Sequence, residues 1–180
     1  MEKLENKLKI KKINIGILGG SFDPAHKGHL LISKEALKKF NLNSIWWIIT
    51  NQNPFKKKSF NDLNKRMIIC KKIIGKNRSI KIKYFEDIIE SKKTIDLINY
   101  LYKKKRYEFF FLMGADNLIN FHKWYKWKSI IKKTKLIVFD RHGYKKKSLN
   151  SKTYKIFGEK KVAFVEFNKV NISSSKLRKI

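Results

Sequence analysis

The feature that most constrains the fold is the regular alternation of short apolar segments with amphipathic ones. Apolar or alternating segments predict strands over 13–18, 45–50, 80–84, 109–113, 135–139 and 161–165. Between them, apolar residues spaced three or four apart predict helices over 27–40, 60–74 and 94–102. Strands that alternate with helices predict right-handed crossovers and a parallel sheet with helices on both faces.

The sequence therefore predicts a Rossmann-like, doubly wound α/β fold. Its 180 residues suit a single domain over residues 1–180, of which residues 1–12 are expected to be flexible and residues 171–180 to begin a helix. Ligands of such folds bind at the carboxyl ends of the strands. We therefore expect the chemistry directly after residues 18, 50, 113 and 139.

The first of these strand ends carries an unusual motif, GGSFDPAHKGH, over residues 19–29. Gly19 and Gly20 let a ligand approach the backbone closely. His26 and His29 stand at the mouth of the next predicted helix, where free N–H groups and the helix dipole favour phosphate. Two imidazoles there can donate hydrogen bonds to phosphoryl oxygens.

The same residues allow plainer interpretations. Two histidines three residues apart could bind a metal, but no third ligand follows at helical spacing, and Asp23 lies across the turn at Pro24. We therefore expect no protein-built metal site. A Gly-Gly pair alone would indicate only a tight turn. The joint pattern, directly after a strand and before a helix, is far more specific.

The charge of the chain is extreme, with 44 Lys and Arg against 14 Asp and Glu and a net charge of +30. A nucleic-acid-binding protein is one interpretation. However, the lysines recur along the whole chain and do not gather in one arm or helix, which favours a diffuse surface bias that steers anionic substrates. We expect no specific nucleic-acid partner.

The remaining composition predicts a cytoplasmic protein without a membrane partner. The single cysteine, Cys70, excludes an intrachain disulfide, and no secretory signal is recognisable at the start of the sequence. The apolar runs are far too short to cross a bilayer. The sequence leaves the oligomeric state open.

The motif at residues 19–29 resembles that of the HxGH nucleotidyltransferase superfamily and, within it, the bacterial nicotinate-nucleotide adenylyltransferases. The resemblance runs from Ile15 to Arg178. It implies transfer of AMP from ATP to nicotinate mononucleotide, which forms nicotinate adenine dinucleotide and pyrophosphate in NAD biosynthesis. It also implies an in-line attack without a covalent intermediate, with Mg²⁺ carried by ATP.

Two further landmarks follow the second and third predicted strands. The Asn53-Pro54-Phe55-Lys56 segment is similar to the family's Asn-Pro-x-Lys loop, although Lys56 could equally be one more solvated lysine. Thr94-Ile95-Asp96 is similar to the family's Thr-x-Asp-Thr, which implies that Thr94 helps to hold the pyridine carboxylate. Leu97 stands where the family has its second threonine. The alternative for Thr94 is a plain helix N-cap.

The fourth landmark is Gly114-Ala115-Asp116 followed by Trp124-Tyr125, which in the family contact the adenosine ribose and the pyridine ring. Trp124 and Trp127, three residues apart on a helix, could instead belong to the core. Arg141 is similar to the arginine that binds the acceptor phosphate, although His142 replaces the family's proline and a surface arginine is the alternative.

The fifth landmark, residues 172–178, is similar to the family's Ile-Ser-Ser-Thr-x-Ile-Arg, with a serine-rich disordered tail as its alternative. The family pattern continues with a further helix, whereas this chain ends two residues after Arg178.

The resemblance thus assigns catalysis to His26, His29, Lys56 and Arg178; ATP binding to Gly19, Gly20, Ser21, Phe22, Gly28, Gly114, Asp116, Ile172, Ser173, Ser174 and Ser175; and acceptor binding to Thr94, Trp124, Tyr125 and Arg141.

Alternatives of the same class remain open at this point. Nicotinamide mononucleotide differs from nicotinate mononucleotide at one amide, and the sequence does not distinguish the two acceptors. Phosphopantetheine adenylyltransferases have threonine where this chain has His26 and lack the Trp-Tyr pair. The cytidylyltransferase signature Arg-Thr-x-Gly-Ile-Ser-Thr-Thr is not found in the chain.

Overall fold

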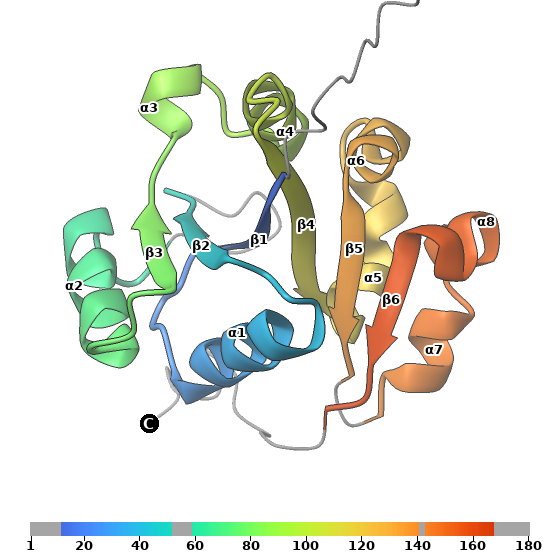
Figure 1. Ribbon diagram of the computed structural model, residues 1–180, viewed down its shortest axis with the longest axis horizontal. Coiled ribbons are helices and arrows are strands. Elements are labelled where there is room, and N and C mark those ends of the chain that lie inside the picture. Colours follow the sequence, from blue (N-terminus) through green and yellow to red (C-terminus); the bar gives the residue numbers. More distant parts are fainter. Residues whose placement is uncertain (1–11, 52–58, 141–142, 168–180) are drawn as a thin grey trace, which may run out of the picture.

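A computed structural model describes residues 12–51, 59–140 and 143–167. Its centre is one six-stranded sheet in the order β3-β2-β1-β4-β5-β6, with every neighbouring pair parallel (Figure 1). The strands are β1 (Ile13–Gly20), β2 (Ser44–Ile49), β3 (Ile80–Lys83), β4 (Tyr107–Gly114), β5 (Lys135–Phe139) and β6 (Val162–Val165). The predicted Rossmann-like fold is confirmed.

Helices cover both faces of the sheet and enclose two separate apolar cores. α1 (Lys27–Lys39) and α2 (Leu63–Ile74) pack on one face around Ala36, Cys70 and Trp47. The other face carries α4 (Thr94–Tyr102), α5 (Ala115–Asn120), α6 (Trp127–Lys133) and α8 (Lys152–Lys161), whose buried side chains surround Phe111. The short helices α3 (Glu86–Ile89), η1 (Phe121–Lys123) and α7 (Lys145–Leu149) lie in the connections.

The strand order places a topological switch point between β1 and β4. After β1 the chain moves outward through β2 and β3, and it then returns to the other side of β1 to form β4. In the register, Gly20 lies opposite Ile49, and Leu18 lies opposite Leu112. The carboxyl ends of β1, β2 and β4 therefore meet at one edge of the sheet, where open α/β sheets bind their ligands.

Several predicted boundaries differ from the structure, and for β1 and α2 the reason is identifiable. β1 runs through Gly19 and Gly20, because both glycines pair with β2 instead of ending the strand. The second helix begins at Leu63 and not at Phe60, since the Asp62 carboxylate accepts the Lys65 N–H and caps the helix there. Phe60, predicted on the buried face, is 81% exposed.

The ends of the first two helices are as the sequence suggests. α1 stops before Asn41, which adopts the left-handed conformation that asparagine tolerates. α2 ends at Gly75, also at positive φ. Within the described ranges, no helix combines the length and the apolar character that a membrane crossing requires.

Candidate functional site

The turn from β1 into α1, residues 19–29, is held by its own histidines and is called here the glycine–histidine turn. His26 is the N-cap of α1, and its Nδ1 accepts the Gly28 N–H at 3.1 Å. The Nδ1 of His29 accepts the His26 N–H at 3.2 Å. Each imidazole thus satisfies a backbone donor that the helix itself leaves open. The two ring centroids lie 3.9 Å apart.

This arrangement fixes which ring nitrogens can donate. A neutral imidazole has one N–H and one acceptor nitrogen. Because Nδ1 accepts in both His26 and His29, the neutral form of each ring carries its proton on Nε2. The turn therefore presents two Nε2–H donors at a helix N-terminus, a combination that suits an anionic ligand.

Phe22 belongs to the core and not to a ligand surface. Its ring is 2% exposed and stacks on Trp47 at 5.0 Å, with an interplanar angle of 16°. Its backbone has φ of 47°, a left-handed conformation that is uncommon for a residue with a side chain. Any contact of Phe22 with ATP would have to involve its backbone. By contrast, Gly19 is exposed and Gly20 and Ser21 are half-buried.

Asp23 ties the turn to the chain that leads into α2. Its carboxylate is 3% exposed and accepts the Phe60 N–H at 2.6 Å, together with the backbone and side-chain N–H groups of Asn61. A carboxylate that accepts several amide hydrogen bonds can stay buried at modest cost. Asp23 thus has a structural role that sequence reasoning, which assigned it only a rigid turn, missed.

The end of β4 is shaped by a glycine and an aspartate. Asp116 stands in the first turn of α5, and a Cβ on Gly114 would clash with its carboxylate. Glycine at position 114 therefore lets the Asp116 carboxylate fold back over the end of the strand. Since β4 neighbours β1, this carboxylate and the glycine–histidine turn lie at the same edge of the sheet.

Trp124 and Tyr125 lie between η1 and α6. Trp124 is half-buried, with its ring against Phe121 at 5.1 Å and edge-on to Phe111 at 6.0 Å, while Tyr125 is 57% exposed. The backbone of Trp124 is extended, so Trp124 and Trp127 do not share a helix as the sequence suggested. Trp124 is therefore packed against the core and remains half-buried.

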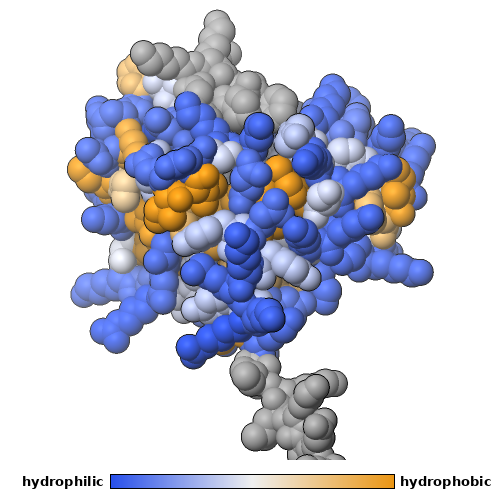
Figure 2. Space-filling view, turned by 90° about the horizontal axis from the view of Figure 1, so that it is seen from above, coloured by the Kyte–Doolittle hydropathy of each residue, from blue (hydrophilic) through white to orange (hydrophobic). Residues whose placement is uncertain are grey.

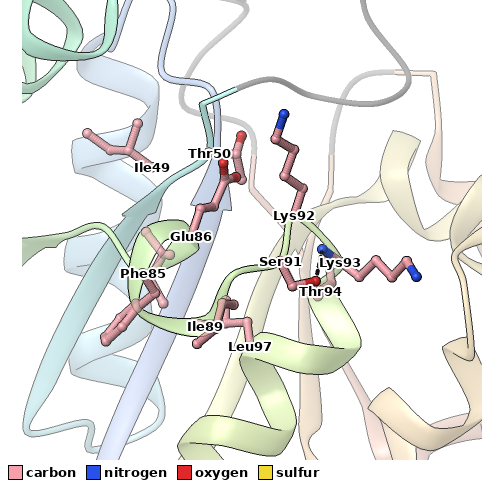
Figure 3. Close-up of a pocket in the computed structure, with 11 residues that line it drawn as sticks. Ile49, Thr50, Phe85, Glu86, Ile89, Ser91, Lys92, Lys93, Thr94 and Leu97 are labelled. Atoms are coloured by element: carbon pink, nitrogen blue, oxygen red, sulfur yellow. Dashed lines mark hydrogen bonds between the residues drawn. The ribbon is translucent and has the colours of Figure 1, made fainter.

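Thr94 lines a hollow between β2 and α4, shown in Figure 3. We define this β2–α4 hollow by Thr50, Glu86, Ser91, Thr94 and Leu97, with Lys92 at its mouth. The N-cap of α4 is Lys93 and no side chain caps the helix, so the N-cap alternative for Thr94 is wrong. Leu97, where the family has a second threonine, makes one wall of the hollow apolar.

The polar groups of this hollow are incompletely satisfied. Glu86 accepts the Asn51 N–H at 3.2 Å through Oε1. Its Oε2 and the hydroxyl of Thr50 are both buried and have no hydrogen-bond partner in the described part of the chain. Figure 3 shows the two side chains turned toward one another. Burial raises the pKa of the Glu86 carboxyl, and the nearby Lys92 and Arg66 lower it to a smaller extent.

The Trp-Tyr segment and the hollow are neighbours. The Lys93 ammonium lies 4.8 Å from the centroid of the Tyr125 ring, a cation–π distance. Thr94 and Tyr125 are thus brought to the same region, as a shared acceptor site requires. Four segments distant in sequence therefore meet at this edge: the glycine–histidine turn, the end of β2, the start of α4, and the region after β4.

Several predicted site residues lie outside the described residues: Lys56, Arg141, Ile172, Ser173, Ser174, Ser175 and Arg178. Their roles stay predictions from the sequence. Among the residues that are described, no group of three His, Cys, Asp or Glu side chains is arranged to hold a metal ion. The described candidates are all brought to the carboxyl edge of the sheet, with Gly28 buried in the first turn of α1.

Sequence reasoning missed Arg66, a residue that the structure makes prominent. It lies on the buried face of α2 and is 1% exposed. Its guanidinium donates to the backbone carbonyls of Ser21, Thr50 and Asn51, which belong to the ends of β1 and β2. The available signal was an arginine placed three residues after Leu63 and four before Cys70, on the apolar stripe of the helix.

The surface around these elements is strongly hydrophilic. Figure 2 shows one face of the molecule covered mainly by hydrophilic side chains, between which hydrophobic ones form separate patches. Lysines in the described part of the chain form few ion pairs, such as Lys39 with Glu35 at 3.3 Å and Lys135 with Glu108 at 3.5 Å. With 44 Lys and Arg against 14 Asp and Glu, most of the cations have no acidic residue with which to pair.

Comparisons with known proteins agree with this geometry. The family model described as cytidylyltransferase-like matches residues 17–180. A probable nicotinate-nucleotide adenylyltransferase of Pelagibacter ubique is 63% identical over 180 residues, which is 100% of both chains. A protein of the same description from a Bradyrhizobium species is 37% identical over 153 residues, covering 84% of this chain and 79% of its own.

The fold also matches solved structures. Nicotinic acid mononucleotide adenylyltransferase of Plasmodium falciparum, in complex with NaAD, superposes with a TM-score of 0.75. The superposition covers 93% of this chain and 83% of the other, at 23% identity. A putative nicotinate-nucleotide adenylyltransferase from Vibrio parahaemolyticus superposes with a TM-score of 0.63 at 18% identity.

Proposed function

The chain belongs to the cytidylyltransferase-like family and, within it, to the nicotinate-nucleotide adenylyltransferases, and we propose that it transfers AMP from ATP to nicotinate mononucleotide by direct in-line displacement. The products are nicotinate adenine dinucleotide and pyrophosphate, so the enzyme is a nucleotidyltransferase of NAD biosynthesis. The geometric observation that supports this proposal is the switch point, where the glycine–histidine turn and Asp116 lie at adjacent strand ends.

The proposed reaction forms one bond and breaks another at the α-phosphorus of ATP. A 5′-phosphate oxygen of nicotinate mononucleotide attacks this phosphorus, and the bond to the bridging oxygen of pyrophosphate breaks as the leaving group departs on the opposite side. The attacking phosphate is already ionised at neutral pH, so the step needs no general base. Catalysis then consists of positioning and charge stabilisation.

His26 and His29 are the described residues best placed to stabilise the phosphates. Their Nδ1 atoms hold the start of α1, and we assign the Nε2–H of each neutral ring as the donor to a phosphoryl oxygen. The helix N-terminus adds its own partial positive charge. Lys56 and Arg178, by family resemblance, add two cations. We propose that Mg²⁺ enters as part of the MgATP substrate.

The adenosine ribose of ATP and the pyridine ring of the acceptor are assigned to different segments of the chain. The Asp116 carboxylate accepts hydrogen bonds from the adenosine ribose hydroxyls, which glycine at position 114 makes sterically feasible. The half-buried Trp124 ring is assigned to stack on the pyridine, and Thr94 in the β2–α4 hollow is assigned to the pyridine carboxylate. Arg141 is proposed for the acceptor phosphate. We place the reaction in the cytoplasm, where ATP is available.

A substrate panel tests this proposal. The purified protein is incubated with MgATP and, separately, with nicotinate mononucleotide, nicotinamide mononucleotide, phosphopantetheine or no acceptor, and pyrophosphate release is followed. We expect the largest kcat/KM with nicotinate mononucleotide and a product of the mass of nicotinate adenine dinucleotide. Faster turnover with either of the other acceptors, or ATP breakdown that needs no acceptor, would contradict the assignment.

A further inference from the structure

Arg66 is a buried cation whose hydrogen-bond partners join three segments of the chain. It stands on α2 and is 1% exposed, although burying a charge is costly unless the charge is well hydrogen-bonded. Its Nη1 donates to the Ser21 carbonyl at 2.8 Å and to the Thr50 carbonyl at 2.7 Å, and its Nη2 donates to the Asn51 carbonyl at 2.9 Å. Its Nε donates to the Asp62 carbonyl at 3.2 Å.

Because these partners are backbone groups, Arg66 holds segments of the main chain together instead of pairing with an acidic side chain. We call this role a strut. Its hydrogen-bond partners within residues 12–51, 59–140 and 143–167 are carbonyl oxygens. Only arginine offers several donors in one rigid plane. The planar guanidinium can therefore fix the end of β1 relative to the end of β2, which a flexible lysine would do less well.

The bond to Ser21 controls the conformation of the glycine–histidine turn. A trans peptide is planar and its C=O and N–H point in opposite directions, so fixing the Ser21 carbonyl also fixes the N–H of Phe22. Phe22 has φ of 47°, and such a conformation persists only where the surroundings hold it. Arg66 on one side and the stack of Phe22 on Trp47 on the other supply that restraint.

The hydrogen bonds from Arg66 to Thr50 and Asn51 connect it to the β2–α4 hollow. Thr50 lines the β2–α4 hollow, and the Asn51 N–H donates to Glu86 of the same hollow at 3.2 Å. The Thr50–Asn51 backbone is thus held by Arg66 through its carbonyls and by Glu86 through one N–H. Arg66 connects the turn at the phosphates to the hollow proposed for the acceptor.

We propose that Arg66 is a positioning residue that sets the distance and orientation between the ATP-binding turn and the acceptor hollow, without touching either substrate. This inference rests on the proposed function, because it assigns the two substrates to those two segments. In-line displacement requires the acceptor oxygen and the α-phosphorus to be aligned closely, and a displacement of about 1 Å can cost about 10²-fold in rate. Loss of the strut should therefore lower kcat more than it raises either KM.

The test compares Arg66→Met, Arg66→Lys and the control Cys70→Ala. Cys70 is one turn further along the same buried face of α2 and is 0% exposed, so its truncation perturbs the same core without removing the strut. Unfolding curves of each variant set an assay temperature at which the protein is folded. Pyrophosphate release is then measured with each substrate varied in turn.

We expect Arg66→Met to lower kcat by about 10²-fold when the rate is expressed per folded molecule. Arg66→Lys should lose less, because an ammonium can still bind some of the carbonyls, and Cys70→Ala should stay within about twofold of the wild type. If Arg66→Met is unfolded at the assay temperature, Arg66→Lys decides, with a loss of at least about fivefold expected from partial misalignment.

Two outcomes would overturn the inference. One is a folded Arg66→Met, or in its absence a folded Arg66→Lys, whose kcat is that of the wild type. The other is a Cys70→Ala variant that loses as much kcat as the Arg66 variants, which would mark a general effect of the core. Both outcomes can be judged only if the wild-type protein is active. A wild type that releases no pyrophosphate with MgATP and nicotinate mononucleotide would instead contradict the proposed function itself.

Discussion

The two halves of the proposed site differ in how completely their polar groups are partnered. In the glycine–histidine turn, Asp23 accepts three amide hydrogen bonds, and each histidine accepts a backbone N–H. In the β2–α4 hollow, Thr50 Oγ1 and Glu86 Oε2 are buried and lack a partner among the described residues. Buried polar groups are nearly always satisfied in folded proteins, so these two groups distinguish the hollow from the turn, where the described polar groups have partners.

If the substrates bind as we propose, they meet two different kinds of surface. The turn for ATP is preorganised by the protein alone, and preorganised donors are the main source of electrostatic catalysis. In the hollow that we propose for the acceptor, two polar groups are not partnered in this way by the described residues. Substitutions in the turn should therefore act mainly on kcat, whereas substitutions on the acceptor side should act mainly on the KM of one substrate.

The largest effect is expected for His29→Ala. Losing one preorganised donor to the phosphates typically costs about 10²–10³ in rate, and we expect kcat to fall by that factor while the fold is kept. Steady-state kinetics and a thermal unfolding curve measure both. His122→Ala, a histidine of η1 outside the turn, is the control and should keep its turnover. If His29→Ala keeps more than about a third of the wild-type rate, worth under ~1 kcal/mol, its role at the phosphates is wrong.

A smaller and more selective effect is expected for Trp124→Ala. Loss of a stacked aromatic face is worth about 1–3 kcal/mol, so the KM of the pyridine nucleotide should rise by about tenfold or more while the KM of ATP changes little. Trp127→Ala is the matched control, because Trp127 is also half-buried and contacts Phe121 and Phe157. Equal losses for both substrates would remove the distinction between the two halves.

The surface charge should act on both halves alike. Both substrates are anions, and salt screens their attraction to the net charge of +30 over about 8 Å at physiological ionic strength. Added salt should therefore lower kcat/KM for both substrates by a few-fold and leave kcat nearly constant.

Duplex DNA titrated at physiological salt should show neither sub-micromolar affinity nor sequence preference. A tight, sequence-dependent complex would favour the nucleic-acid alternative.

The smallest effect is expected for Glu86 in the hollow, and it concerns the free energy of unfolding. Burial raises the pKa of the Glu86 carboxyl in the folded state, so the folded protein binds this proton more tightly than the unfolded chain does. Stability from this group is therefore lost as the pH rises from the unfolded pKa through the folded one. Glu86→Gln cannot ionise, and urea unfolding should show its stability rising relative to the wild type between acid and neutral pH. If the difference in free energy of unfolding between Glu86→Gln and the wild type does not change with pH, burial does not raise the pKa of Glu86.

The parallel sheet was predictable because its strands are short, apolar and evenly separated by helical patterns. β5 matches its predicted range, and so does the helix α4. The helices after Asp116 were not predicted from the sequence, since α5, α6, α7 and α8 are short or lysine-rich and show little periodicity. Short helices depend on tertiary packing more than on their own pattern.

The site was predictable where a residue type carries its own chemistry, as at His26 and His29. It was not predictable where chemistry depends on three-dimensional burial. Arg66 is one arginine among many cations in the sequence, and only the fold shows that it reaches the carbonyls of Ser21 and Thr50. The buried hydroxyl of Thr50 and the strained backbone of Phe22 likewise have no local sequence signal.

The strand order also has a consequence for how the chain is made. β1 pairs with β2 on one edge but waits for β4, which begins at Tyr107, to cover the other. A nascent chain that has exposed only β1, β2 and β3 therefore presents an open strand edge with no apolar cover on one face. Such edges are templates for pairing with other chains. We therefore expect an interval during synthesis, ending near the emergence of β4, in which self-association competes with completion of the sheet.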